Sequence, residues 1–217
     1  MKFKLFIILF VGLFPASSVK NVCLKLLGWR VSSKAKIRPN IFLNLKSVTI
    51  GENSVIRPFN VFRDVTLEIG NDSIIGSWNW ISSASGLVGK PGYLGLLKLG
   101  NHSSINSRHY FDVSGGVMLN DFSTVAGVRS TFVTHQINTI ESKQTCSSIR
   151  IGNHVMIGSN SVFVPGGIRI GNRSVFAMGS VVASGDYGDD SLFAGVPAKF
   201  KKKTKGEYFG RTIGVVN

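Results

Sequence analysis

The chain has 217 residues, with 25 lysines and arginines against 11 aspartates and glutamates, so its formal net charge at pH 7 is +14. This length fits a single domain. The basic balance suits phosphorylated ligands or anionic lipid headgroups. No aromatic residues interleave with the lysines and no nucleic-acid-binding module is visible, so nucleic acid is the least favoured partner. The two cysteines, Cys23 and Cys146, lie far apart, which favours a reducing compartment.

Residues 1–30 form an apolar segment of their own. The run from Leu5 to Phe14 is too short to span a bilayer, and a second apolar stretch follows at Val22 to Leu27. Three interpretations stay open: two helices that cap the next element, two helices that lie on a membrane surface, or a cleaved signal peptide. In the membrane interpretation, the lysines that face the headgroups are Lys2, Lys4, Lys20 and Lys25.

Residues 31–185 carry a repeat. An aliphatic residue followed by glycine or asparagine returns at Ile50, Ile69, Leu99, Leu119, Ile151 and Ile170, and within each unit an apolar residue recurs every sixth position, as in Ile151, Ile157 and Phe163. A step of six fits neither a helical stripe nor a long alternating strand. It fits short strands joined by tight corners. Three such sides make one coil of about 18 residues, with coils about 4.8 Å apart. The sequence therefore predicts an all-β solenoid, a parallel β-helix of hexapeptide repeats, in preference to a β-sandwich.

Two segments interrupt this pattern, and a third ends it. Residues 84–98 are rich in glycine and leucine but keep the step of six, so a coil and a loop both remain open. Residues 136–148 are polar and out of phase, which predicts a loop ejected from the helix. Beyond residue 185 the repeat is lost, and residues 186–217 are expected to form a basic C-terminal tail.

One histidine lies at the root of the ejected loop. His135 follows an expected strand over residues 130–133 and precedes the polar segment. Loops on a rigid scaffold often carry function, and an imidazole is suited to act as a general base on a hydroxyl group. A surface histidine without a role remains the alternative at this stage.

Three local patterns resemble the hexapeptide-repeat acyltransferases, in particular the galactoside, maltose, xenobiotic and polysaccharide O-acetyltransferase branch. They are Thr134-His135 before a polar loop, the coil from His154 to Ser159, and the pair of segments 176–182 and 193–199, which resembles "I-G-A-G-S-V-V … G-x-P-A-K". The resemblance covers about residues 37–203. It implies a left-handed β-helix, a homotrimer with active sites between subunits, and acetyl transfer from acetyl-CoA to a hydroxyl of a sugar or polysaccharide precursor.

The resemblance also assigns roles to residues. His135 would be the general base, and Asn106 would orient the acceptor. The residues it places along acetyl-CoA are Ser159, Ala177 and Met178 at the pantetheine arm, and Ser184, Lys199 and Lys202 toward the nucleotide. Lysines there suit the phosphate charges of the co-substrate. Met156 and Met178 depart from the family pattern, which puts the shape of the donor channel in doubt. No metal is expected.

Other functions remain possible at this stage. An N-acetyltransferase acting on an amino sugar would keep the fold, and a non-enzymatic solenoid scaffold would need neither His135 nor its loop. A serine acetyltransferase normally has a sizeable helical domain before its β-helix, which the leading 36 residues cannot supply. Because acetyl-CoA is a cytosolic metabolite, we expect a cytoplasmic protein, held at the inner face of the membrane through residues 1–28.

Overall fold

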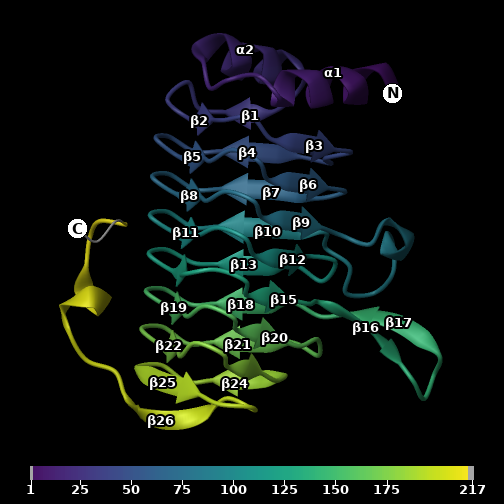
Figure 1. Ribbon diagram of the computed structural model, residues 1–217. Helices are drawn as coiled ribbons and strands as arrows, with labels where there is room; N and C mark the ends of the chain where they lie inside the picture. Colours follow the sequence, from purple (N-terminus) through teal and green to yellow (C-terminus); the bar gives the residue numbers. More distant parts are fainter. Residues whose placement is uncertain (1, 215–217) are drawn as a thin grey trace.

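The computed structural model describes the backbone of residues 2–214 and the side chains of residues 4–214 (Figure 1). Short strands stack into three sheets, here called sheets A, B and C, in which every strand except the last one of sheet B is parallel to its neighbours. Sheet A contains β1 (Arg30–Val31), β4 (Val48–Ile50), β7 (Thr66–Ile69), β10 (Leu96–Leu99), β13 (Val117–Leu119), β18 (Ile149–Ile151), β21 (Ile168–Ile170) and β24 (Gly185–Tyr187). Sheet B contains β2 (Lys36–Ile37), β5 (Val55–Ile56), β8 (Ile74–Ile75), β11 (Ser104–Ile105), β14 (Thr124–Val125), β19 (Met156–Ile157), β22 (Val175–Phe176), β25 (Ser191–Ala194) and β26 (Lys199–Lys203). Sheet C contains β3 (Ile41–Leu43), β6 (Val61–Arg63), β9 (Trp80–Ser82), β12 (Tyr110–Asp112), β15 (Thr131–Phe132), β20 (Val162–Phe163) and β23 (Val181–Val182).

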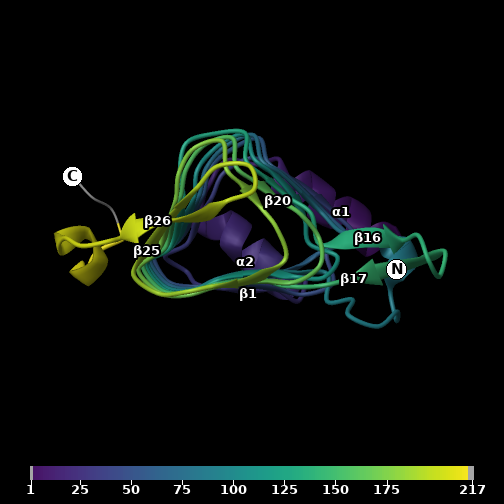
Figure 2. The same ribbon diagram turned by 90° about the horizontal axis from the view of Figure 1, so that it is seen from below.

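The three sheets form the sides of a triangular prism. The chain visits sheets A, B and C in turn, which defines three edges: A/B, B/C and C/A. Seen from the C-terminal end, this path runs clockwise while the chain advances toward the viewer, so the winding is left-handed (Figure 2). The all-β, left-handed parallel β-helix expected from the repeat and the resemblance is confirmed.

The apolar residues of the step of six fill the inside of the prism. Phe111, Phe132 and Phe163 stack in neighbouring coils with ring centroids 4.4 Å apart, and each is fully buried. The parallel register places Phe111 beside Phe132, and Phe132 beside Phe163. One inward residue per side of each coil therefore builds a continuous core, which is why the sequence shows this period.

The N-terminal segment caps the first coil. Helices α1 (Lys2–Gly12) and α2 (Ser18–Leu26) lie across the end of the prism (Figure 1). Ile8 and Leu24 face inward, and a Cβ atom at Gly12 would lie 2.8 Å from the Phe42 ring. Within residues 2–214, no helix combines the length and apolar character needed to cross a bilayer. This packing agrees with the cap interpretation.

Lys20 corrects one detail of the membrane interpretation. Its side chain does not face headgroups but is 3% exposed, and its ammonium group donates to the carbonyls of Gly12, Phe14 and Arg38 at 2.7 to 3.1 Å. The carbonyls of Gly12 and Phe14 lie at and just after the end of α1, and that of Arg38 precedes β3, so one lysine ties the helix end to the first coil. Burial lowers the pKa of Lys20 to about 8. The side chain of Lys2 lies outside the described residues.

Two segments leave the prism at the C/A edge. Residues 83–95 form a loop that contains the short helix η1 (Ser85–Leu87), and the chain rejoins sheet A at β10, so the stretch that the sequence left undecided is a loop up to residue 95. The second segment is an antiparallel hairpin of β16 (His135–Asn138) and β17 (Lys143–Cys146). It projects from one corner of the triangle, as expected for an ejected segment (Figure 2).

The C-terminal boundary drawn at residue 185 differs from the structure. β24 and β25 continue sheets A and B in parallel register, so the helix extends about ten residues further. The sequence conceals this part because Gly185-Asp186-Tyr187 lacks the aliphatic pattern of earlier coils. β26 then pairs antiparallel with β25, and the chain turns back along the A/B edge through η2 (Glu207–Gly210). Residues 215–217 of the expected tail lie outside the described residues.

Candidate active site

A histidine and a buried carboxylate form a pair at the C/A edge. His135 Nδ1 lies 2.8 Å from Asp112 Oδ2, with the imidazole 35% exposed and the Asp112 side chain 5% exposed. The carboxylate also accepts a hydrogen bond from the His135 amide at 3.1 Å. A carboxylate on Nδ1 favours the tautomer with the proton on that nitrogen, so Nε2 is the ring atom that can accept a proton.

Asp112 is held ionised by its neighbours. Burial would raise the pKa of this carboxyl group, but hydrogen bonds from Ser114, His135 and Thr134 outweigh burial and keep its pKa below the ordinary value. Ser114 Oγ donates to Oδ1 at 2.6 Å, and the Thr134 amide donates to Oδ2 at 2.7 Å. The carboxylate is therefore fixed in position and charged at neutral pH, as the partner of a general base must be.

The repeat itself brings the two residues together. The core residues Phe111 and Phe132 are register partners, so the residues that follow them, Asp112 and Val133-Thr134-His135, leave sheet C in neighbouring coils. Asp112 was missed by the sequence analysis. The available signal was an acidic residue directly after a core phenylalanine, one coil before the candidate base.

Cys146 lies opposite His135 in the hairpin. It is a free cysteine, and burial, with a smaller contribution from the charge of Asp112, raises the pKa of its thiol. A thiol with a raised pKa is a poor nucleophile at neutral pH. The corner is therefore arranged around an imidazole oriented by a carboxylate and not around an activated thiol.

Four further predicted site residues lie on a different edge of the prism. Asn106, Ser159, Ala177 and Met178 all follow strands of sheet B, at the B/C edge. The backbone ladder of this edge runs from coil to coil, with Asn106 N donating to Val125 O and Ala177 N to Phe193 O. In the later coils this edge is rich in small residues, as at Ala126-Gly127 and Gly158-Ser159. A Cβ atom at Gly127 would collide with Ser159 Oγ, so the coils approach closely and leave backbone accessible along the edge.

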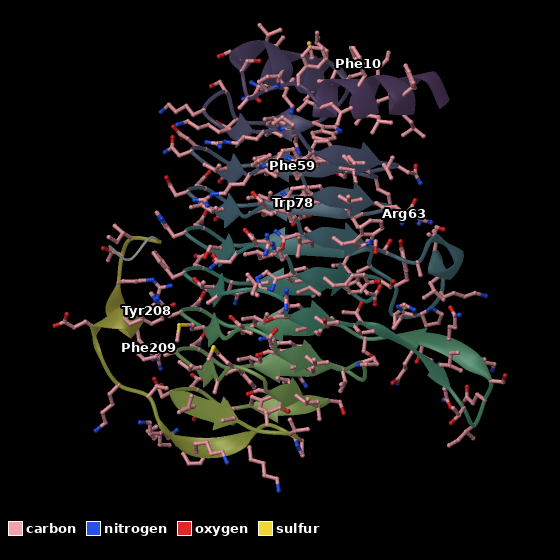
Figure 3. The ribbon with its side chains drawn as sticks, in the orientation of Figure 1. Phe10, Phe59, Arg63, Trp78, Tyr208 and Phe209 are labelled. Atoms are coloured by element: carbon pink, nitrogen blue, oxygen red, sulfur yellow. The ribbon has the colours of Figure 1, made fainter. Side chains whose placement is uncertain are left out.

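A groove lies on the outer face of sheet B, next to the B/C edge. Its volume is about 560 Å³, and its lining includes Asn106, Thr124 and Met156 together with Tyr208 of the C-terminal segment. Tyr208 and Phe209 lie on the segment that runs back beside the prism (Figure 3). Arg211 anchors that segment by donating to the carbonyls of Tyr208, at 2.8 Å, and Phe122. The sequence analysis gave no role to this segment.

The remaining predicted donor residues lie elsewhere. Ser184 follows β23 at the C/A edge, the edge of His135, and lines a second groove with Ser147 and Arg169. Lys199 and Lys202 are exposed on β26 at the C-terminal end. Within one chain, His135 therefore lies on the C/A edge and Asn106 on the B/C edge. The two residues do not share a site in a single copy. Within residues 2–214, no cluster of three histidine, cysteine or acidic side chains could hold a metal ion.

Comparisons with known proteins agree with this architecture. A family model described as the hexapeptide repeat of succinyl-transferase matches residues 148–184. A search of curated protein sequences found no match. The chain carries hexapeptide repeats, and the expected family resemblance is confirmed at the level of the repeat and the fold.

Two solved structures show the extent of the likeness. A maltose O-acetyltransferase from Clostridium difficile 630 is 20% identical, with a TM-score of 0.51 over 62% of this chain and 67% of that one. AntD, an N-acyltransferase from Bacillus cereus in complex with dTDP-4-amino-4,6-dideoxyglucose and coenzyme A, is 18% identical, with a TM-score of 0.54 over 86% of this chain and 90% of that one. At these identities the likeness establishes a common fold.

Proposed function

We propose that the protein transfers an acetyl group from acetyl-CoA to a hydroxyl of a sugar or polysaccharide precursor. The observation that carries this proposal is the His135–Asp112 pair, 2.8 Å apart, at the root of a hairpin ejected from a left-handed β-helix. A structural scaffold needs no base oriented by a buried carboxylate. Acyltransferases described above share the fold, and one of them is crystallised with coenzyme A.

The pair suits direct attack without a covalent enzyme intermediate. His135 Nε2 takes the proton of the acceptor hydroxyl while its oxygen attacks the thioester carbonyl carbon. Asp112 stabilises the imidazolium that forms, and a backbone amide stabilises the oxyanion of the tetrahedral intermediate. Collapse of that intermediate breaks the carbon–sulfur bond. The leaving thiolate takes the proton from Nε2, which returns the base to its starting state.

The separation of His135 from Asn106 supports an active site shared by two copies. Sheet A presents charged side chains outward, including Lys98 and Glu68, whose charged groups lie 3.6 Å apart, and Arg169 and Asp186, 2.8 Å apart. Sheet C presents apolar ones instead: Ile41, Trp80 and Tyr110 are 37% to 45% exposed, beside Phe59 and Trp78 on the B/C edge, whose rings lie 4.7 Å apart at an angle of 31° (Figure 3). Exposed apolar surface of this extent is typical of an interface.

A cyclic homotrimer would bury that face. Packing sheet C of one copy on sheet B of the next is a heterologous contact, which closes into a ring when repeated three times. The hairpin and the C-terminal segment lie at opposite corners of the triangle, so this ring would bring the His135 corner of one copy to the groove of its neighbour (Figure 2). Asn106 in that groove would then orient the acceptor.

The donor would lie along the small residues of the B/C edge. The pantetheine arm would follow Ser159, Ala177 and Met178, Ser184 would approach it from the neighbouring copy, and the exposed Lys199 and Lys202 would meet the nucleotide phosphates. Because acetyl-CoA is cytosolic, the proposed reaction takes place in the cytoplasm.

Two measurements test this function. Coenzyme A should raise the melting temperature of the protein, whereas a scaffold would not respond. Mass spectrometry of glycans from cells with and without the protein should reveal one added acetyl group in its presence. Adding an amino sugar beside neutral sugars distinguishes O-transfer from N-transfer, since N-transfer leaves an alkali-stable amide. Absence of both the thermal shift and the acetyl group would reject the enzyme.

A further inference from the structure

The N-terminal end of the prism presents an apolar surface, here called the cap surface. It consists of exposed side chains of α1, α2 and the link between them: Phe6, Phe10, Phe14, Val19, Val22 and Leu26. Their exposed fractions run from 47% to 84%. Phe10 lies at this end of the molecule, and Phe10 and Phe14 pack edge to face with centroids 5.1 Å apart (Figure 3).

The cap surface is not needed to close the β-helix. In α2 the inward side carries the buried Lys20, Asn21 and Leu24, while Val19 and Val22 face away. In α1 the inward residues are Ile8 and Gly12. Each helix therefore has one side that covers the first coil and another that exposes apolar groups to water. A cap that only closes a solenoid has a polar outer side, so this second apolar side indicates a partner.

The charge around the cap surface specifies what kind of partner. Residues 1–51 contain nine lysines and arginines and no aspartate or glutamate. Lys4 and Lys25 are exposed on the two helices, and Arg30, Lys36 and Arg38 are exposed on the first coil. A purely basic rim around an apolar surface matches a lipid bilayer with anionic headgroups. Two cap surfaces facing each other would bring like charges together, which disfavours end-to-end association of copies.

We propose that the cap surface docks on an anionic membrane, with α1 and α2 lying in the plane of the lipid headgroups. The phenylalanine, valine and leucine side chains enter the acyl boundary, and the basic rim contacts the phosphates. This inference does not require the proposed reaction. In the proposed cyclic trimer all cap surfaces lie at the same end, so three would engage one bilayer together and strengthen binding.

The test is co-sedimentation of the full chain with vesicles of phosphatidylcholine, with and without about 30% phosphatidylglycerol. We expect binding to the anionic vesicles that weakens at high salt. The triple variant Phe10→Ser, Val22→Ser and Leu26→Ser should lower the partition coefficient on the order of 100-fold, because three apolar groups no longer leave water. The matched control is Ile137→Ser with Ile140→Ser, which changes exposed apolar residues of the hairpin and should bind like wild type.

Two binding results would overturn the proposal: no binding of the wild type to anionic vesicles, or an equal loss of binding in the hairpin control. A third result comes from light scattering without lipid. If the triple variant has half the mass of the wild type, the cap surface is a contact between copies and not a membrane-binding surface. If the triple variant fails to fold, Lys25→Gln with Lys36→Gln decides, since it must reduce the preference for anionic over neutral vesicles.

Discussion

The B/C and C/A edges of the prism each contain a histidine, and the two histidines differ in every respect that matters for chemistry. On the B/C edge, His109 continues a ladder in which each side chain accepts a hydrogen bond from the amide one coil further on: Asn40, Asn60, Asn79, His109 and Ser130. His109 is 2% exposed. On the C/A edge, His135 begins an ejected hairpin and is 35% exposed.

Their electrostatic surroundings diverge in the same way. Burial lowers the pKa of His109 to about 4, and its Nδ1 accepts a hydrogen bond from the Ser130 amide, which a protonated Nδ1 could not do. His135 instead has an ionised carboxylate on Nδ1. Where the coils follow one another without interruption, as on the B/C edge, a histidine is buried and neutral within the ladder of hydrogen bonds. Where a hairpin interrupts the coils, as on the C/A edge, a histidine is exposed beside a fixed charge.

Removing the base should abolish most of the activity. We expect His135→Ala to lower kcat on the order of 100- to 10,000-fold, the usual contribution of a general base, with coenzyme A binding unchanged. Steady-state kinetics together with a coenzyme A thermal shift measure both. The matched control is His109→Asn, which should keep kcat near wild type. Wild-type turnover by His135→Ala would remove this residue from the mechanism.

Neutralising the carboxylate should also be severe. Asp112→Asn loses the charge that stabilises the imidazolium, and an amide group on Nδ1 would favour the wrong tautomer of His135, so kcat should fall by up to about 10,000-fold. The Michaelis constant for acetyl-CoA should not change. Asp64→Asn is the control, because Asp64 is a buried carboxylate on the same edge two coils earlier. An equal loss in both variants would indicate general damage to the edge.

His109 should make the fold sensitive to mild acid. Its pKa in the folded state, about 4, lies below the ordinary value of 6.5, so the unfolded chain binds the proton first as the pH falls. Stability is therefore complete above pH 6.5 and declines toward pH 4, by up to about 3 kcal/mol. His109→Asn extends the asparagine ladder and should flatten this decline in urea melts. A decline of unchanged slope would assign the acid sensitivity to other groups.

The tail lysines should give the smallest effect. Lys199→Gln with Lys202→Gln should raise the Michaelis constant for acetyl-CoA about 3- to 10-fold, because each exposed charge pair contributes little. Added salt should reproduce the change in the wild type. Lys98→Gln on sheet A is the control. If the acceptor constant changes instead, the lysines belong to an anionic glycan site.

The fold could be predicted from the sequence because the residues that fill the core recur at every sixth position. Every sixth residue, as in Ile151, Ile157 and Phe163, points into the core and must be apolar. The residues between them can vary widely without hiding this pattern. His135 was also accessible, because the loss of period after it marks the ejected hairpin. The coil containing β24 escaped detection because glycine and tyrosine replace its aliphatic residues.

The site was harder to predict because its parts have no period. Asp112 is a single acidic residue within an apolar strand, and only alignment of Phe111 with Phe132 brings it beside His135. To place Asn106 and His135 on different edges from sequence, one must assign each residue to a side of its coil. The corners vary in length, so this assignment cannot be made reliably by counting residues. The burial of Lys20 depends on carbonyls at the end of α1, and no local pattern reports them.

Mixing two impaired variants tests the shared active site most directly. His135→Ala lacks the base, and Asn106→Ala should lose about 10-fold or more in acceptor turnover because the hydroxyl is no longer oriented. When the two are denatured and refolded together, random assembly into rings leaves about a quarter of the sites with both residues intact. Acetyl transfer should then recover to about a quarter of the wild-type rate. Recovery no greater than the average of the two separate variants would show that each copy works with its own residues alone, and would contradict the account.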